Sequence, residues 1–240
     1  MRKLRIADNL TTRAYKTIKN YIWEGRLDDR LRITEEYLSR QLGISKSPIR
    51  EALNRLESEG LIRIEPRRGA YLRTFSIKEI QDLYGVREAL EVHAISTVNP
   101  TPELLDKLQR SVDGLRRHVV DNNKFLHLEE ALQFHAILAD DTGNEYLARM
   151  MENVRHQVWL FRRKTYDVQR SGAVDAHAEI VHALAKGDKT AAQRLMRDHI
   201  CTVRDRLITQ LESHDVLSLP TSKDGEELPP AKRAGHLVRR

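Results

Sequence analysis

The chain has 240 residues, of which 40% are hydrophobic and 32% are charged, so it is long enough for two domains with packed cores. Its one cysteine, Cys201, excludes an intramolecular disulfide, and no apolar run approaches the length needed to cross a membrane. With no signal-peptide pattern after Met1, these features favour a cytoplasmic protein without membrane association.

The positive charge is concentrated in the first third of the chain. Residues 1–74 hold 17 Lys and Arg against 10 Asp and Glu, whereas residues 75–216 hold 19 against 22. A basic segment neutralises the phosphates of nucleic acid, although solvated basic faces are also common. The charge therefore permits nucleic-acid binding by the first segment and does not establish it.

Two helix patterns occupy the first 43 residues. The first helix is predicted from Thr11 or Thr12 to about Glu24. Its buried face would carry Ala14, Ile18 and Ile22. Thr34 is placed to cap a second helix over residues 35–42, which a glycine ends.

Residues 43–74 have the outline of a winged helix-turn-helix. Ser45 would start a third helix with Pro48 in its first turn, where a missing N–H is tolerated. Two β patterns, residues 61–65 and 70–74, follow and are joined by a Pro-Arg-Arg-Gly turn. Helix, turn, helix and two-stranded wing form a DNA-reading module whose second helix of the helix-turn-helix enters the major groove.

The start of that third helix and the tip of the wing carry the residues expected to contact DNA. Hydroxyls and backbone N–H groups at a helix N-terminus suit phosphate oxygens, and Lys and Arg side chains reach base edges. A basic wing tip can enter the minor groove or touch phosphate. The candidates are Ser45, Lys46, Ser47, Arg50, Arg67, Arg68 and Gly69. A three-helix core with a solvated basic face would not need cap, proline and wing in this order.

From Ser76 onward the pattern is helical and predicts an all-α antiparallel bundle. Ser76 and Glu79 have the spacing of a capping box. Six helices are expected, over about residues 77–98, 102–122, 125–141, 145–170, 174–186 and 189–214. The fold class is therefore mainly α. We expect a winged helix-turn-helix over residues 1–75, an effector-binding and dimerisation bundle over 76–215, and a disordered tail over 216–240.

Three histidines fall on separate helices of the predicted bundle: His135, His177 and His199. Imidazoles from antiparallel helices can converge inside a bundle and bind a divalent metal. Spacing alone does not establish such a site. The chain has 10 histidines, and a histidine is more often a surface residue or hydrogen-bonded to a neighbour.

Three segments resemble a known protein family. GISKSPIREALNRLESEGLIRIEPRRGAYL, residues 43–72, is similar to the winged helix of GntR-type bacterial transcription regulators. FHAILADDTGNEYL and DAHAEIVHALAKGDKTAAQRLMRDHI resemble the helical effector-binding bundle named for the FadR C-terminal domain, which one large GntR subfamily contains. The resemblance implies that the recognition-helix and wing residues above touch an operator. It also implies that His135, His177 and His199 bind a metal and an effector.

Two positions of the resembling bundle need comment. Similar members use an Asp four residues before the first histidine, and here that position is Ala131. Either three imidazoles bind Zn²⁺ or Ni²⁺ with water or effector completing the shell, or the pocket is vacant or purely hydrogen-bonding. Arg87 matches a polar position that faces the cavity and would pair with a carboxylate effector. Alternatively, Arg87 forms a structural ion pair with Glu91 or Glu88.

The predicted function is a homodimeric, ligand-responsive regulator, a repressor, that binds a near-palindromic operator in double-stranded DNA. A small carboxylic acid in the bundle would act by binding one arrangement of the winged helices better than the other. The competing hypothesis is an enzyme, a metal-dependent hydrolase with a DNA-targeting winged helix, but no obvious general base accompanies the histidines. A third hypothesis, an architectural DNA-binding protein, would need no cavity with an arginine and histidines.

Overall fold

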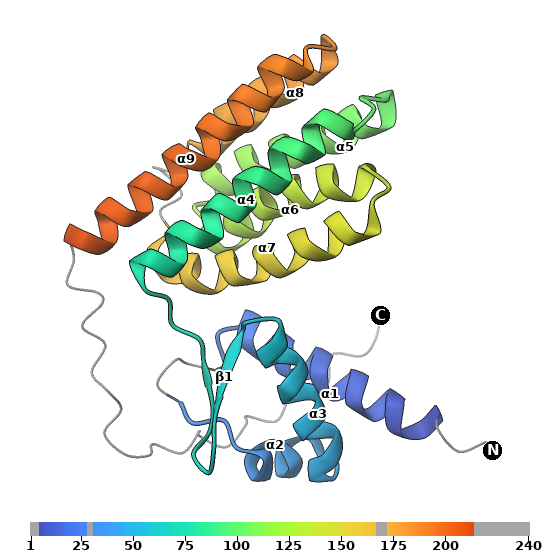
Figure 1. Ribbon diagram of the computed structural model, residues 1–240, viewed down its shortest axis with the longest axis vertical. Helices are drawn as coiled ribbons and strands as arrows, with labels where there is room; N and C mark the ends of the chain where they lie inside the picture. The colour runs from blue at the N-terminus through green and yellow to red at the C-terminus, as the bar shows by residue number, and fades with distance from the viewer. Residues whose placement is uncertain (1–4, 28–30, 167–171, 214–240) are drawn as a thin grey trace. The chain divides into compact units, whose positions relative to one another are not determined.

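The computed structural model describes residues 5–27, 31–166 and 172–213 (Figure 1). The chain divides into two compact units, with the boundary between Thr74 and Phe75. The predicted disordered tail, residues 216–240, lies outside the described residues. Each unit is described separately below.

The first unit contains three helices followed by a two-stranded antiparallel sheet (Figure 1). The elements are α1 (Arg5–Trp23), α2 (Glu35–Leu42), α3 (Lys46–Ser58), β1 (Ile62–Glu65) and β2 (Gly69–Leu72). In the sheet Ile62 pairs with Leu72 and Glu65 with Gly69. This order is that of a winged helix-turn-helix.

Local signals explain most of these boundaries. The Thr34 hydroxyl accepts a hydrogen bond from Tyr37 N (3.1 Å) and caps α2, and Gly43 (φ 65°) ends that helix. Pro48 is buried in the first turn of α3, where no N–H donor is required.

The predicted start of the first helix was wrong. α1 begins at Arg5, so Thr11 and Thr12 lie inside the helix. No helix breaker separates residues 5–10 from the apolar stripe, and the Thr11 hydroxyl finds a partner in Glu51 of α3 (2.8 Å). A threonine with a side-chain partner on another helix does not need to cap its own.

The second unit is a bundle of six helices among the described residues, and those residues include no strand after Thr74 (Figure 1). The helices are α4 (Ile77–Thr97), α5 (Pro102–Val120), α6 (Lys124–Asp141), α7 (Glu145–Thr165), α8 (Ala173–Ala185) and α9 (Lys189–Ser213). α4 packs along α9, α5 along α6, α6 along α7 and α8 along α9. This arrangement confirms the predicted mainly α fold class.

Two features of the bundle test the sequence patterns directly. The capping box at the start of α4 is present, because the Ser76 hydroxyl and the Glu79 carboxylate each accept from the other residue's backbone N–H. The predicted extent of α7 was wrong: the helix ends at Thr165, and Tyr166 is extended with ψ 126°. The Tyr166 ring packs instead against His127 of α6.

Buried polar and charged side chains of the described residues are confined to the second unit. They are Arg87, Glu91, Ser111, His127, His135, His156, Arg163, His177 and His199. Such groups are rarely buried unless they are paired or bind something, so they point to a binding site in this unit.

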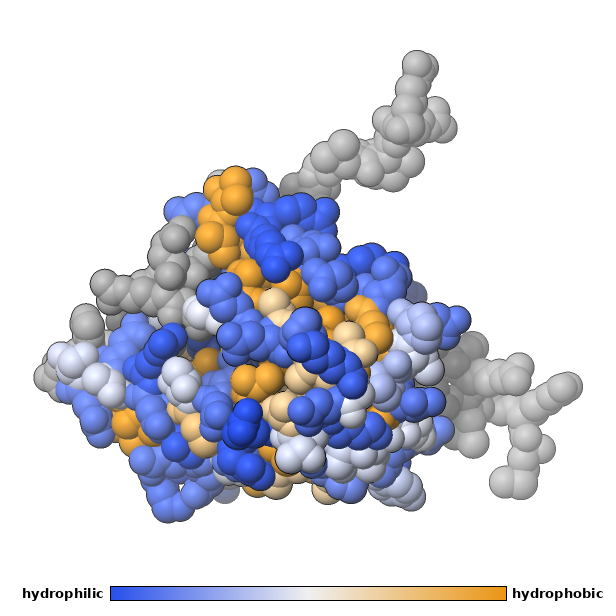
Figure 2. All heavy atoms as spheres, turned by 90° about the horizontal axis from the view of Figure 1, so that it is seen from above, coloured by the Kyte–Doolittle hydropathy of each residue, from blue (hydrophilic) through white to orange (hydrophobic). Residues whose placement is uncertain are grey.

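Figure 2 shows one face on which hydrophilic side chains dominate and apolar side chains form short stretches between them. Large hydrophobic side chains that remain exposed include Val86, Val120, Phe125, Leu126, Tyr146 and Met150. No helix among the described residues has the length and apolar character that spanning a bilayer requires.

Candidate functional site

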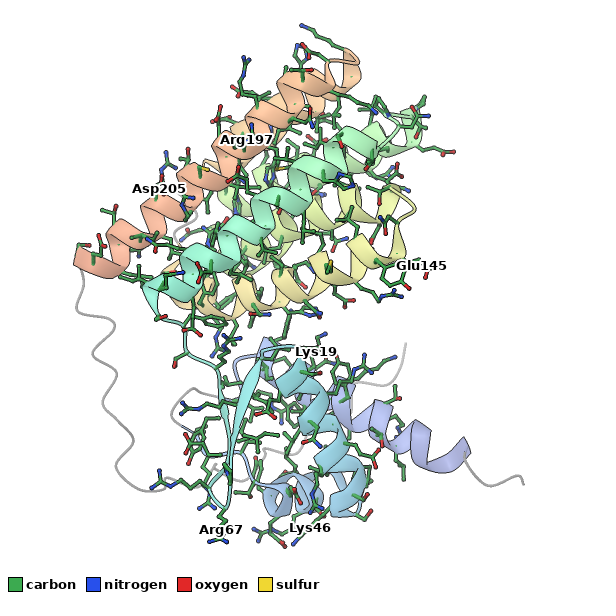
Figure 3. The ribbon with its side chains drawn as sticks, viewed as in Figure 1. Lys19, Lys46, Arg67, Glu145, Arg197 and Asp205 are labelled. Atoms are coloured by element: carbon green, nitrogen blue, oxygen red, sulfur yellow. The ribbon has the colours of Figure 1, made fainter. Side chains whose placement is uncertain are left out.

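The exposed face of α3 and the wing carry the predicted DNA contacts. Ser45, Lys46, Ser47 and Arg50 are exposed, whereas Ile49 and the other apolar residues of α3 are buried. Lys46 and Arg67 project from the part of the first unit where α3 begins and the wing turns (Figure 3). The structure thus presents cations from two elements on one side of this unit.

Two cations of α3 are held by acids of α2. Arg50 donates from Nε and Nη2 to the two carboxylate oxygens of Glu35, at 2.7 and 2.8 Å. Lys46 pairs with Glu36. These hydrogen bonds lower the pKa of Glu35 and of Glu36. Arg50 and Lys46 are therefore both paired with carboxylates of α2.

The wing turn has strained backbone at its tip. Arg67 has a positive φ of 65°, and Gly69 has a φ of 100°. A Cβ on Gly69 would lie 2.9 Å from the Ile33 carbonyl oxygen, so only glycine fits this close approach. Arg67 and Arg68 are exposed, and Arg68 lies 3.8 Å from Glu65. The turn therefore presents two guanidinium groups to solvent.

The three predicted histidines converge in the second unit. His135 comes from α6, His177 from α8 and His199 from α9, and their ligand atoms all lie within 4.8 Å of one another. The Nε2 atoms of His177 and His199 are 3.3 Å apart. His177 also stacks on Phe134, with ring centroids 4.0 Å apart, which fixes the plane of its ring.

Burial keeps these imidazoles neutral. Burial lowers the pKa of His135, and it lowers the pKa of His177 and of His199 well below the usual value. At His135 the nearby Glu91 carboxylate partly opposes this lowering of the pKa. Neutral imidazoles have the lone pairs that a divalent cation requires. Two nitrogens at about 2.05 Å from a tetrahedral Zn²⁺ would lie about 3.3 Å apart, which matches the His177–His199 spacing.

The carboxylate beside the cluster comes from a helix that the sequence pattern did not indicate. Ala131 lies one turn before His135 and has no ligand atom. Glu130 lies against Gly114 of α5, where a Cβ would approach its carboxyl carbon at 3.1 Å. Instead, Glu91 of α4 contacts Nδ1 of His135. A carboxylate on one ring nitrogen leaves the other nitrogen as the ligand atom.

Arg87 forms the ion pair that was the alternative interpretation of its sequence position. Its Nε donates to Glu91 Oε1 (2.6 Å), and both side chains are 2–3% exposed. Burial raises the pKa of a carboxyl group, but Arg87 and His135 together hold that of Glu91 at about 2. Glu88 pairs with Arg197 on α9 instead (2.9 Å).

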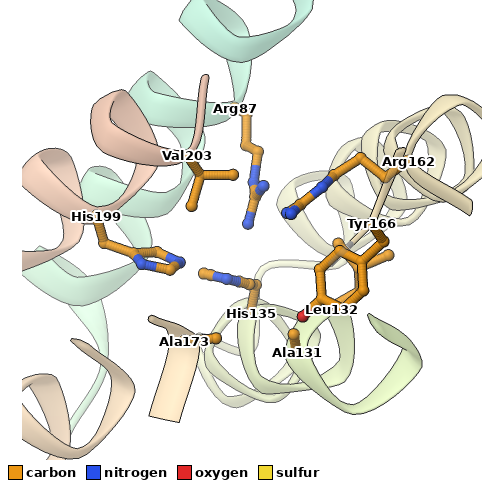
Figure 4. A pocket seen from close by; sticks show the side chains of 9 residues that line it. All are labelled: Arg87, Ala131, Leu132, His135, Arg162, Tyr166, Ala173, His199 and Val203. Atoms are coloured by element: carbon orange, nitrogen blue, oxygen red, sulfur yellow. The ribbon is translucent and has the colours of Figure 1, made fainter. Parts of the chain in front are cut away.

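A pocket beside the histidines opens to solvent, and its empty space, open solvent included, is about 270 Å³. In Figure 4 His199 lies on one side, Arg162 and Tyr166 on the other, and Arg87 between them. The remaining lining residues are Ala131, Leu132, His135, Ala173 and Val203. Arg162 and Tyr166 were not singled out from the sequence, because no periodic signal marks the last turn of α7 as pocket-facing.

A winged helix-turn-helix and a separate helical unit with a polar pocket define the class of DNA-binding regulators that carry a ligand-binding domain. Comparison with known families agrees with this class. Residues 10–72 match the bacterial regulatory proteins of the gntR family, and residues 82–202 match the FCD domain. The chain belongs to the GntR family of bacterial transcription regulators, with an FCD domain. It is a DNA-binding regulator and not an enzyme.

Individual relatives are more distant. The HTH-type regulators YdhC and LutR of Bacillus subtilis (strain 168) are 27% and 28% identical, over 77% and 74% of this chain and 85% and 91% of theirs. The repressor RspR of Escherichia coli (strain K12) is 26% identical over 70% of this chain and 75% of its own.

Solved structures share the fold. A GntR transcriptional regulator from Rhodococcus sp. RHA1 has a TM-score of 0.75 at 22% identity, covering 83% of this chain and 97% of that one. E. coli McbR/YncC has a TM-score of 0.72 at 19% identity, covering 85% and 98%.

Proposed function

We propose that this regulator binds a near-palindromic operator as a homodimer and represses transcription until a small carboxylic acid binds its FCD domain. A two-fold dimer presents two recognition helices, so its operator has two related half-sites. The relative RspR is described as a repressor, which supports the direction of regulation. The acid would act by binding one arrangement of the dimer better than another.

One observation carries the proposal for the second unit. Three neutral imidazoles from three helices meet beside a buried Arg–Glu pair, and two of them, His135 and His199, line a pocket that opens to solvent. A core built for stability alone gains little from this arrangement, because burying polar groups is unfavourable unless every partner is satisfied. Nδ1 of His177 has no partner among the described residues.

A divalent metal fits these residues. His135, His177 and His199 would hold Zn²⁺ or Ni²⁺, and Glu91 would orient His135. The 4.8 Å limit of the cluster is wider than the spacing of ligand atoms in a tetrahedral site, so one ring would shift by roughly 1.5 Å. The ion would supply a positive charge and open coordination positions for an acid.

Metal content tests the site. The triple variant His135→Ala, His177→Ala, His199→Ala should lose the Zn²⁺ or Ni²⁺ that the parent retains after dialysis, measured by elemental mass spectrometry. His182→Ala is the matched control, since His182 is exposed on the same helix as His177. Equal metal content in parent and triple variant would remove the metal site.

Operator selection tests the DNA-binding face. Arg50→Ala should weaken binding to sites selected from random duplexes by roughly 1–3 kcal/mol and relax the base preference. Arg116→Ala, which removes an exposed arginine of the second unit, is the charge control. A variant that selects the same sequences as the parent would contradict the assignment of α3 as the reading helix.

A further inference from the structure

The pocket beside the histidines has a second polar wall, at the end of α7. Arg162 and Tyr166 line it on the side away from His199 (Figure 4). The Tyr166 hydroxyl is 2.5 Å from Nδ1 of His127, which lies on α6 one turn before Ala131. The hydroxyl is therefore held against α6 next to the small side chain of Ala131.

His127 acts here as a fixed, neutral hydrogen-bonding group. Its ring is fully buried, and burial lowers the pKa of His127 to about 4. A hydroxyl has a single donor, so Tyr166 can donate to a ligand only when the neutral His127 carries its proton on Nδ1 and donates it to the tyrosine oxygen. Tyr166 is thus a rigid polar group in the pocket wall.

The charges of the pocket single out Arg162. Among the lining residues only Arg87 and Arg162 are charged at neutral pH, because burial keeps His135 and His199 neutral. Arg87 is neutralised by Glu91, which contacts it at 2.6 Å.

The half-buried Arg162 side chain has no ion pair with any described residue. Its guanidinium lies 4.6 Å from the Tyr166 ring centroid. Arg162 therefore supplies the uncompensated positive charge of the pocket, and the stacking on Tyr166 restrains its direction.

We propose that Arg162 and Tyr166 form the carboxylate-binding end of the pocket. This inference rests on the proposed acid effector and specifies where its acid group binds. The carboxylate accepts hydrogen bonds from the Arg162 guanidinium and the Tyr166 hydroxyl. Arg87 keeps its ion pair with Glu91. A second polar group of the same molecule, a hydroxyl or another carboxylate, then faces His135 and His199, the two histidines that line the pocket. The ligand class is small hydroxy acids and dicarboxylates.

Binding of defined acids tests this assignment. Succinate, L-malate and L-lactate, with succinamide and lactamide as uncharged analogues, are titrated into the full chain by calorimetry, after EDTA treatment and after Zn²⁺ addition. Arg162→Gln should weaken acid binding roughly ten- to a hundredfold and Tyr166→Phe roughly three- to tenfold, since each removes a hydrogen bond to a charged group. Metal content should not change in either variant.

The chain offers a matched control pair. Arg149 stacks on Tyr146 (4.5 Å) on the exposed face of the same helix. Arg149→Gln and Tyr146→Phe should bind the acids like the parent. If the parent binds an acid and Arg162→Gln binds it equally well, the carboxylate end is wrongly placed while the acid effector stands. If the parent binds none of the acids with or without Zn²⁺, the inference and the acid effector both fail.

Discussion

The buried Arg87–Glu91 pair allows a quantitative test of how the second unit is held together. Glu91→Gln keeps the size and shape of the side chain and removes its charge. Arg87 would then remain 2% exposed without a counter-ion, and Nδ1 of His135 would lose its contact with a carboxylate. Glu91 is ionised at neutral pH, since its pKa is about 2.

The expected loss of stability follows from the burial of both partners. Removing one member of a buried ion pair destabilises a protein by about 3–5 kcal/mol, because the other charge remains buried and unpaired. Gln still offers one acceptor to Arg87, so we expect the lower end, about 3 kcal/mol. Removing both charges with Arg87→Met and Glu91→Leu should recover most of that loss, because no uncompensated charge remains.

The two tryptophans make the assay specific. Trp23 lies in α1 and Trp159 in α7, so a Trp23→Phe background leaves Trp159 as the reporter of the second unit. Trp159 is 5% exposed, and unfolding in urea should shift its emission. The free energy of unfolding is then read from the transition of this unit alone.

A matched substitution on the same helix sets the baseline. Glu88→Gln breaks a pair in which Arg197 is 52% exposed, and such surface pairs contribute about 0.2–1 kcal/mol. If Glu91→Gln destabilises the second unit no more than Glu88→Gln, the buried pair does not have the energetic role assigned to it. If the double replacement is as unstable as Glu91→Gln, packing and not charge explains the loss.

Three further outcomes follow from individual contacts. Glu36→Gln frees Lys46 from its ion pair, so affinity for random duplex DNA should rise. The slope of log affinity against log salt concentration should become steeper by up to about one, and an unchanged slope would mean that Lys46 does not meet phosphate. In the folded state the pKa of His127 lies at about 4, below the ordinary 6.5. Between these pH values the unfolded chain binds more protons than the folded chain, so the free energy of unfolding falls as the pH is lowered from 6.5 to 4. His127→Gln should remove up to about 3 kcal/mol of that fall, measured as urea unfolding at pH 7 and pH 4, and an identical pH dependence in the two proteins would contradict it. Gly69→Ala should destabilise the first unit by about 1–3 kcal/mol, because its Cβ would press on the Ile33 carbonyl oxygen and the residue has a positive φ. Fluorescence of the tryptophan in α1 reports unfolding of this unit, and a loss below about 0.5 kcal/mol would be inconsistent with the strained turn.

The sequence by itself determined the elements whose signals are local. Thr34 and Ser76 cap helices with groups three residues away, and Gly43 ends a helix through its own φ. The order of helix, turn, helix and wing could be predicted because each step depends on neighbours in the chain. The three histidines could be proposed as a cluster because they fall on separate predicted helices and match the histidines of the resembling family.

Only the tertiary structure decided which side chains meet. Arg50 pairs with Glu35 across 15 residues, and His127 bonds to Tyr166 across 39. Glu91 reaches His135 from another helix. No local pattern encodes such pairs, because they depend on how far each helix extends and on its rotation against its neighbours. Because α7 ends at Thr165, Tyr166 turns toward α6 and packs against His127. This places Tyr166 in the wall of the pocket, beside Arg162.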